Sequence, residues 1–181
     1  FANSSRGLAI LADGMGGYNA GEEASGMAIR LLSSGLESAL AGGAPATAES
    51  GGESGSLRCL REQIALANAA IYHAAISEPQ YSGMGTTLVA VLFHDNRVTV
   101  AHIGDSRLYR LRGDHFCTLT RDHSLLQEQI DSGLISAEEA RYSLNRNLVT
   151  RALGVDPVVE TEISEHAVLP GDIYLLCSDG L

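Results

Sequence analysis

Three apolar runs of this chain each end on an aspartate, and this feature constrains the fold more than any other. The runs are "RGLAILA" before Asp13, "VTVAHIG" before Asp105 and "IYLLCS" before Asp179. Apolar runs of this length are typical of buried strands. An ionised carboxylate is costly to bury unless it is paired or bound to a cation. Strands that end in this way can meet at one rim of a sheet, where their carboxylates would share a partner.

Carboxylate oxygens gathered at a rim favour a hard divalent cation. Such oxygens suit Mg²⁺ or Mn²⁺, whereas zinc prefers His and Cys. Gly14, beside the first aspartate, leaves its backbone carbonyl open to a cation, and Gly16 and Gly17 allow the chain to bend away. Two alternatives stay open: an Asp-Gly pair can be a simple turn, and a cation such as Arg107 can neutralise the carboxylates.

Length and charge limit the classes of function. The 181 residues fit one domain, and the formal net charge of −10 excludes a nucleic-acid or anionic-membrane partner. The three cysteines are odd in number and lack CxxC spacing, which favours a reducing cytoplasm over a disulfide framework. No apolar stretch approaches 18 residues. The chain begins on Phe1 and stops on Leu181, so we expect a piece of a longer protein, truncated at both ends.

Hydrophobic periodicity predicts an α+β fold. Two helices are expected at 21–40 and 57–76, with a flexible Gly/Ser-rich loop at 41–56 between them. Strands are expected at 6–12, 86–93, 97–103, 107–112, 115–120, 158–164 and 172–177. A polar helical stretch at 124–143 carries a capping box formed by Ser136 and Glu139. Runs of hairpins with helices before and between them favour antiparallel sheets with helices packed outside.

Six motifs occur in a fixed order and together resemble the bacterial form of the metal-dependent Ser/Thr protein phosphatases of type 2C. The resemblance covers nearly the whole chain. The motifs are "ADGMGGYNAGEEAS" (12–25), "GMGTTLVAV" (83–91), "HIGDSRLYRLR" (102–112), "LTRDHS" (119–124), "RNLVTRALG" (146–154) and "LLCSDGL" (175–181). The family resemblance implies a four-layer α-β-β-α sandwich of two antiparallel sheets, with the whole of 1–181 as one incomplete catalytic domain and a flap at about 122–147.

The resemblance also implies a role for each acidic residue. Asp13 matches the carboxylate that bridges two divalent cations, and the Gly14 carbonyl helps to hold the second. Asp179 matches a ligand of the first cation, and Asp105 matches an outer aspartate that can hold a third together with Asp179. Catalysis would then run through Asp13 and Asp179 by way of a hydroxide that bridges two Mg²⁺ or Mn²⁺ ions and attacks a phosphoserine or phosphothreonine monoester.

The sequence departs from the family pattern at three points. An upstream strand with a phosphate-gripping Arg and an acidic ligand is absent, and Arg6 does not replace it. A further downstream aspartate is also absent, so this fragment is expected to bind metal poorly or not at all and to be inactive, whereas the parent protein is expected to be an active phosphatase. Met15 stands where some relatives carry a histidine, and methionine has no proton to give to the leaving oxygen.

Several other residues near the motifs are interpreted as structural. Ser106 and Ser178 lack a Ser–His–Asp arrangement, and Cys177 has no basic neighbour that would favour a thiolate. His102 is a candidate to support Asp105, and His123 is expected to anchor the base of the flap. The remaining residues in this group, Thr86 and Thr87, are taken as strand residues near the site.

Partners and rival functions follow from the same motifs. We expect a monomeric cytoplasmic enzyme whose substrates are phosphoproteins made by a Ser/Thr kinase. The first rival is a phosphatase-like domain with an inactive metal site that binds a partner. The second is the same chemistry used as a sporulation or stress switch on a phosphoserine protein, and the third is a purely structural module.

Overall fold

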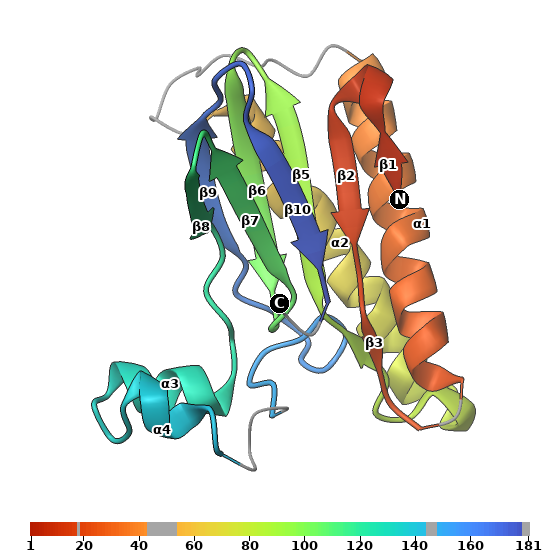
Figure 1. Cartoon of the computed structure of the whole chain (residues 1–181). Coiled ribbons are helices and arrows are strands. Elements are labelled where there is room, and N and C mark those ends of the chain that lie inside the picture. Colours follow the sequence, from red (N-terminus) through yellow and green to blue (C-terminus); the bar gives the residue numbers. More distant parts are fainter. Residues whose placement is uncertain (18, 43–53, 144–147, 179–181) are drawn as a thin grey trace.

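Two antiparallel sheets and a pair of long helices form three stacked layers in the computed structural model of the chain (Figure 1). The structure describes residues 1–17, 19–42, 54–143 and 148–178. The helices are α1 (Ala20–Ala41), α2 (Gly55–Ser77), α3 (Leu125–Asp131) and α4 (Ala137–Ala140), with short 3-10 turns η1 (Ser4–Arg6) and η2 (Pro79–Tyr81). The predicted α+β class is confirmed.

The first sheet has five strands in the order β1-β2-β5-β6-β9, and the second has three in the order β10-β7-β8. A short pair, β3-β4, stands apart from both. The strands are β1 (Ala2–Asn3), β2 (Leu8–Leu11), β3 (Gly14–Met15), β4 (Gly85–Thr86), β5 (Leu88–His94), β6 (Arg97–Ile103), β7 (Arg107–Arg112), β8 (His115–Thr118), β9 (Glu162–Ala167) and β10 (Ile173–Cys177).

Strand β5 shows how the sequence divides the core into two. Successive side chains of a strand point to opposite faces, so Leu88, Ala90 and Leu92 pack on the helix side, where α1 and α2 lie. Val89 and Val91 belong to the second cluster, which lies between the two sheets and includes Leu108 of β7. Because both faces of β5 are buried, its sequence is continuously apolar and not alternating.

Helices α1 and α2 cover one face of the five-stranded sheet and agree closely with the predicted ranges. Ser54 starts α2, since its side chain accepts a hydrogen bond from the Leu57 N–H at 3.2 Å. No helix covers the outer face of the three-stranded sheet among the described residues (Figure 1). Within that same part of the chain, no helix is both long and apolar enough to cross a membrane.

Two strands differ from their predicted ranges for tertiary reasons. The strand expected at 86–93 is interrupted at Thr87, because the Thr87 N–H donates to the Asp13 carbonyl at 2.9 Å. The strand expected at 158–164 begins instead at Glu162. Residues before it form a loop tied to α2, where the Asn68 amide donates to the Asp156 carbonyl at 3.0 Å and accepts the Gly154 N–H at 2.8 Å.

The predicted loops can be compared with the structure only in part. Most of the loop expected at 41–56 falls on residues 43–53, outside the described residues, while residue 41 closes α1 and residues 55–56 open α2. The turn at Asp95 and Asn96 has positive φ at both positions, as a tight hairpin needs.

Gly14 packs against the first turn of α1, backbone to backbone. A Cβ placed on Gly14 would lie 1.8 Å from the Gly21 carbonyl oxygen, and one on Gly21 would lie 2.8 Å from the Gly14 carbonyl carbon. Both positions therefore require glycine for helix packing. This packing requirement is separate from the predicted role of an accessible Gly14 carbonyl.

We predict that Gly14→Ala lowers the free energy of unfolding by about 1–3 kcal/mol, the usual cost of overpacking. Gly17→Ala is the matched control, because a Cβ there meets nothing within 4 Å. Urea unfolding followed by circular dichroism measures both. Equal stability of the two variants would contradict the packing described here.

Candidate metal centre

The antiparallel register brings two of the predicted aspartates to one end of the five-stranded sheet. Leu11 of β2 pairs with Val89, and Leu88 of β5 pairs with Ile103 of β6. Strands β2 and β6 therefore end within one residue of each other on either side of β5. Asp13 and Asp105 each follow two residues after these ends.

Asp13 and Asp105 line the same cavity, which has a volume of about 290 Å³, and both side chains are half-buried. The described residues that line it are Asp13, Gly14, Met15, Thr87, Asp105, Leu148 and Val149. The third predicted carboxylate, Asp179, lies outside the described residues. The last residue of β10, Cys177, pairs with Arg107 of β7.

The Asp13 peptide is held by two threonines that precede β5. Its carbonyl accepts the Thr87 N–H at 2.9 Å and the Thr86 hydroxyl at 3.0 Å, and its N–H donates to Thr87 Oγ1 at 3.1 Å. Both threonine side chains are buried. Asp13 thus leaves the sheet along a fixed path, although the two threonines stand more than 70 positions away in the sequence.

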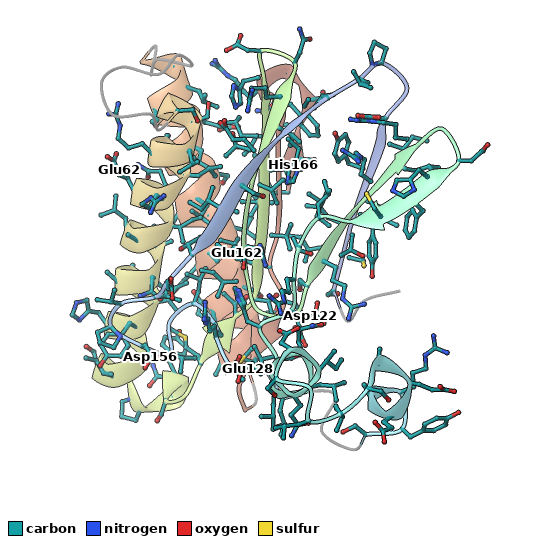
Figure 2. The ribbon with its side chains drawn as sticks, turned by 90° about the vertical axis from the view of Figure 1, so that its left-hand side faces the viewer. Glu62, Asp122, Glu128, Asp156, Glu162 and His166 are labelled. Atoms are coloured by element: carbon teal, nitrogen blue, oxygen red, sulfur yellow. The ribbon has the colours of Figure 1, made fainter. Side chains whose placement is uncertain are left out.

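Arg107, which the sequence left open as a counter-ion for the carboxylates, is paired elsewhere. Its guanidinium donates to both Asp122 oxygens, with Nε–Oδ1 at 2.7 Å and Nη2–Oδ2 at 2.6 Å. Hydrogen bonds to Asp122 raise the pKa of Arg107 above its ordinary value, so the guanidinium stays charged. Asp122 lies where the chain leaves the sheets toward α3 and α4 (Figure 2).

The donor set of the cavity fits a hard divalent cation. Two carboxylates and backbone oxygens are the ligands that Mg²⁺ and Mn²⁺ accept. The described residues that line the cavity include no Lys, Arg or His. Two aspartates on one small cavity repel each other unless a cation lies between them, so the arrangement supports the predicted metal centre.

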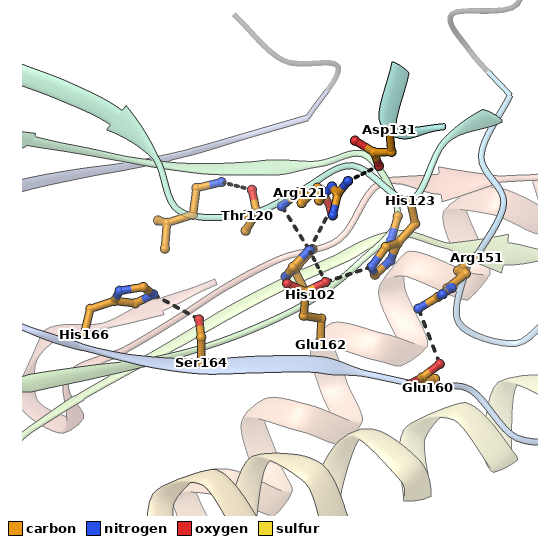
Figure 3. Close-up of polar contacts among 12 residues, drawn as sticks. His102, Thr120, Arg121, His123, Asp131, Arg151, Glu160, Glu162, Ser164 and His166 are labelled. Atoms are coloured by element: carbon orange, nitrogen blue, oxygen red, sulfur yellow. Dashed lines mark hydrogen bonds and ion pairs between the residues drawn. The ribbon is translucent and has the colours of Figure 1, made fainter. Parts of the chain in front are cut away.

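His102 and His123 form a stacked pair at the base of the predicted flap, and neither lines the cavity. Their ring centroids are 4.9 Å apart with an interplanar angle of 15°. His102 Nε2 lies 2.8 Å from the Arg121 carbonyl oxygen (Figure 3). The Gly104 N–H donates to His123 Nδ1 at 3.2 Å. The backbone N–H of His123 donates in turn to the Gly104 carbonyl at 2.9 Å. His123 thus contacts the residue before Asp105.

These two rings and Glu162 bring three possible ligand atoms within 4.8 Å of one another. Their hydrogen bonds argue against a metal there. His123 Nδ1 accepts a hydrogen bond from a backbone N–H, so the proton of the neutral ring stands on Nε2, which faces Glu162 Oε2 at 3.5 Å. A ligating histidine normally donates its second ring N–H outward and presents a bare nitrogen to the metal. The cluster is therefore held together by hydrogen bonds and stacking, and His123 presents no bare nitrogen to a metal.

The segment that directly follows the predicted flap contributes Leu148 and Val149 to the cavity. The described part of the flap contains α3 and α4, and the capping box at Ser136 and Glu139 is present as expected. After residues 144–147, which lie outside the described residues, the chain returns through an isolated bridge between Ser124 and Val149. This bridge brings Val149 to the cavity, a position that local periodicity did not single out.

Comparison with known proteins gives a consistent result. The family model described as "Protein phosphatase 2C" matches residues 2–181. The serine/threonine phosphatase stp of Listeria welshimeri is 42% identical over 174 residues, which cover 96% of this chain and 66% of the relative. The crystal structure of the Mycobacterium tuberculosis serine/threonine phosphatase PstP is 41% identical, with a TM-score of 0.81, over 95% of this chain and 68% of that one.

A further similar structure contains a metal. It is the catalytic domain of PstP in complex with two manganese ions, 40% identical with a TM-score of 0.77, over 95% of this chain and 66% of that chain. The present chain spans 66% of the length of the Listeria relative.

We predict that acidification from pH 7 to pH 5.5 destabilises the fold through His123. Burial, His102 and Arg151 lower the pKa of His123, and Glu162 opposes them only in part. The unfolded chain therefore binds the proton first, so stability is full above the unfolded pKa of about 6.5 and falls as the pH drops below it. His166, whose pKa burial also lowers, adds to the same trend.

His123→Asn keeps an acceptor for the Gly104 N–H and removes the titrating ring, so its stability should depend less on pH than that of the wild type. His115→Asn, at an exposed histidine, is the matched control. Urea midpoints at the two pH values measure the effect. An undiminished pH dependence in His123→Asn would show that the ring is not the buried neutral base described.

Proposed function

The chain belongs to the protein phosphatase 2C family, and from this premise we propose that the protein containing it hydrolyses phosphoserine and phosphothreonine in proteins, with Mg²⁺ or Mn²⁺ as cofactor. The observation that carries the proposal is the meeting of Asp13 and Asp105 on one cavity. The two manganese ions bound by the similar PstP catalytic domain support the choice of cation.

In this proposal four residues hold the cations. Asp13 would serve two of them, the Gly14 carbonyl would contribute to the second, Asp179 would bind the first, and Asp105 would hold a third together with Asp179. Asp13, Gly14 and Asp105 share the cavity. The role of Asp179 rests on the sequence motif, because that residue lies outside the described ones.

Bound divalent cations lower the pKa of a coordinated water and neutralise phosphoryl oxygens, which is the chemistry that phosphate-ester hydrolysis needs. The chain's own contribution is to hold the oxygen ligands still. The threonine hydrogen bonds fix the Asp13 peptide, and the Arg107–Asp122 pair fixes the segment that leads into α3. Met15 lines the cavity without an ionisable group, so it cannot serve as the general acid.

The acidic character of the chain is consistent with this assignment. A chain of formal charge −10 repels a phosphorylated partner at long range. Cations held by the aspartates would reverse the local sign at the cavity, so that phosphate is attracted where the chemistry occurs. The inactive-regulator alternative has less support, because both described carboxylates are retained on one cavity.

The wider setting stays a proposal. We propose that the substrates are phosphoproteins made by a Ser/Thr kinase, and that the protein acts as a monomer in the cytoplasm. The sporulation or stress switch uses the same chemistry and differs only in its substrate.

We predict that the full-length protein releases phosphate from a phosphothreonine peptide only when Mn²⁺ or Mg²⁺ is present, and that EDTA abolishes the release. Asp13→Asn should lower the rate at least about 100-fold, equal to about 2.7 kcal/mol of barrier, because it removes charge from the bridging ligand. Released phosphate measured over a Mn²⁺ series gives both results.

Asp114→Asn is the control, since this exposed aspartate stands in the hairpin turn between β7 and β8. It should keep the wild-type rate. Thermal unfolding should show that Asp13→Asn is folded. Activity that survives chelation, or a fully active Asp13→Asn protein, would refute the proposed function.

A further inference from the structure

Thr87 connects the two carboxylate-bearing segments through one side chain. Its Oγ1 accepts the Asp13 N–H at 3.1 Å and lies 2.7 Å from the Ser106 hydroxyl. Thr87 is 3% exposed and Ser106 is 1% exposed, so water does not compete for these hydrogen bonds. Ser106 directly follows Asp105. A single hydroxyl thus joins the peptide of one aspartate to the neighbour of the other.

The methyl group of Thr87 makes the second contact with the Asp105 segment. A Cβ placed on Gly104 would lie 2.7 Å from Thr87 Cγ2, and Gly104 has a φ of +98°. The turn that carries Asp105 therefore rests directly on Thr87, with no space for a further atom. From its other side the turn is held by His123 through both backbone groups of Gly104.

The chemistry at this position requires a hydroxyl. A hydroxyl has two acceptor lone pairs and one hydrogen, so Thr87 can accept the Asp13 N–H and also exchange a hydrogen bond with Ser106. Valine has the same shape but can do neither, and it would leave a buried N–H unsatisfied. Serine keeps both hydrogen bonds and loses only the methyl contact with Gly104.

We propose that Thr87 is a positioning residue whose hydroxyl sets the separation between Asp13 and Asp105, and thereby the affinity of the cavity for the cations that the two aspartates hold. The proposal rests on the proposed function and adds to it a residue whose hydroxyl is engaged by the Asp13 N–H and by Ser106. Ser106 is the partner through which the hydroxyl acts on Asp105.

A purely structural role for Thr87 makes a different prediction. Loss of a buried hydrogen bond lowers stability wherever it occurs, so stability alone does not separate the two roles. Thr99 offers a matched comparison, because its buried hydroxyl contacts His94 Nε2 at 2.8 Å and Glu165 Oε1 at 3.0 Å. It lies four residues before the cavity end of β6.

The test is Mn²⁺ binding to the full-length protein, measured by isothermal titration calorimetry. We expect Thr87→Val to weaken at least one Mn²⁺ site about tenfold, equal to about 1.4 kcal/mol, while Thr87→Ser binds like the wild type. Thr99→Val should lose thermal stability and keep its Mn²⁺ affinity. Unchanged affinity in Thr87→Val, or an equal loss in Thr99→Val, would overturn the proposal.

Ser106→Ala provides a second route should Thr87→Val fail to fold. It removes the partner of the same hydroxyl and should weaken the same Mn²⁺ site. The double variant Thr87→Val/Ser106→Ala should lose no more affinity than Thr87→Val alone, since coupled residues are not additive. A wild-type protein that binds no Mn²⁺ would overturn the proposed function as well, whereas wild-type binding with unaffected variants would overturn only the role of Thr87.

Discussion

The antiparallel register of β2, β5 and β6 is the constraint on which the rest of this structure depends. It aligns the ends of β2 and β6 on either side of the start of β5, so that Asp13 and Asp105 enter one cavity. A shift by one residue would turn every β5 side chain to the opposite face and would mix the two halves of the core. The burial that stabilises the sheet and the geometry of the candidate metal centre therefore share one cause.

Around this register, short polar contacts between distant segments fix the local detail. Thr87 and Ser106 join the two aspartate segments, and the histidine pair with the Arg107–Asp122 pair ties the base of the predicted flap to the same turn. Each contact connects residues 15 or more positions apart. The cavity thus has rigid walls on the sheet side, which suits ligands that must hold cations at fixed positions.

Local pattern was sufficient for the helices and for most of the strands. Apolar residues spaced at intervals of three and four predicted α2. The apolar strand-like stretches predicted β5, β6, β7 and β10 to within a few residues. Pattern was not sufficient where a distant partner decides the backbone. The predicted strand is interrupted at Thr87 because the Thr87 N–H donates to the Asp13 carbonyl. Strand β9 begins later than predicted because Asn68 is hydrogen-bonded to the preceding loop. From the sequence, the convergence of Asp13 and Asp105 on one site was only one possibility, because no single segment determines strand order or register.

The most direct test of the central claim is anomalous diffraction at the manganese edge from crystals of the full-length protein soaked in Mn²⁺. The account predicts anomalous peaks within coordinating distance, about 2.0–2.3 Å, of the Asp13 and Asp105 carboxylate oxygens. Manganese found instead at His102, His123 and Glu162, with none beside the two aspartates, would contradict it.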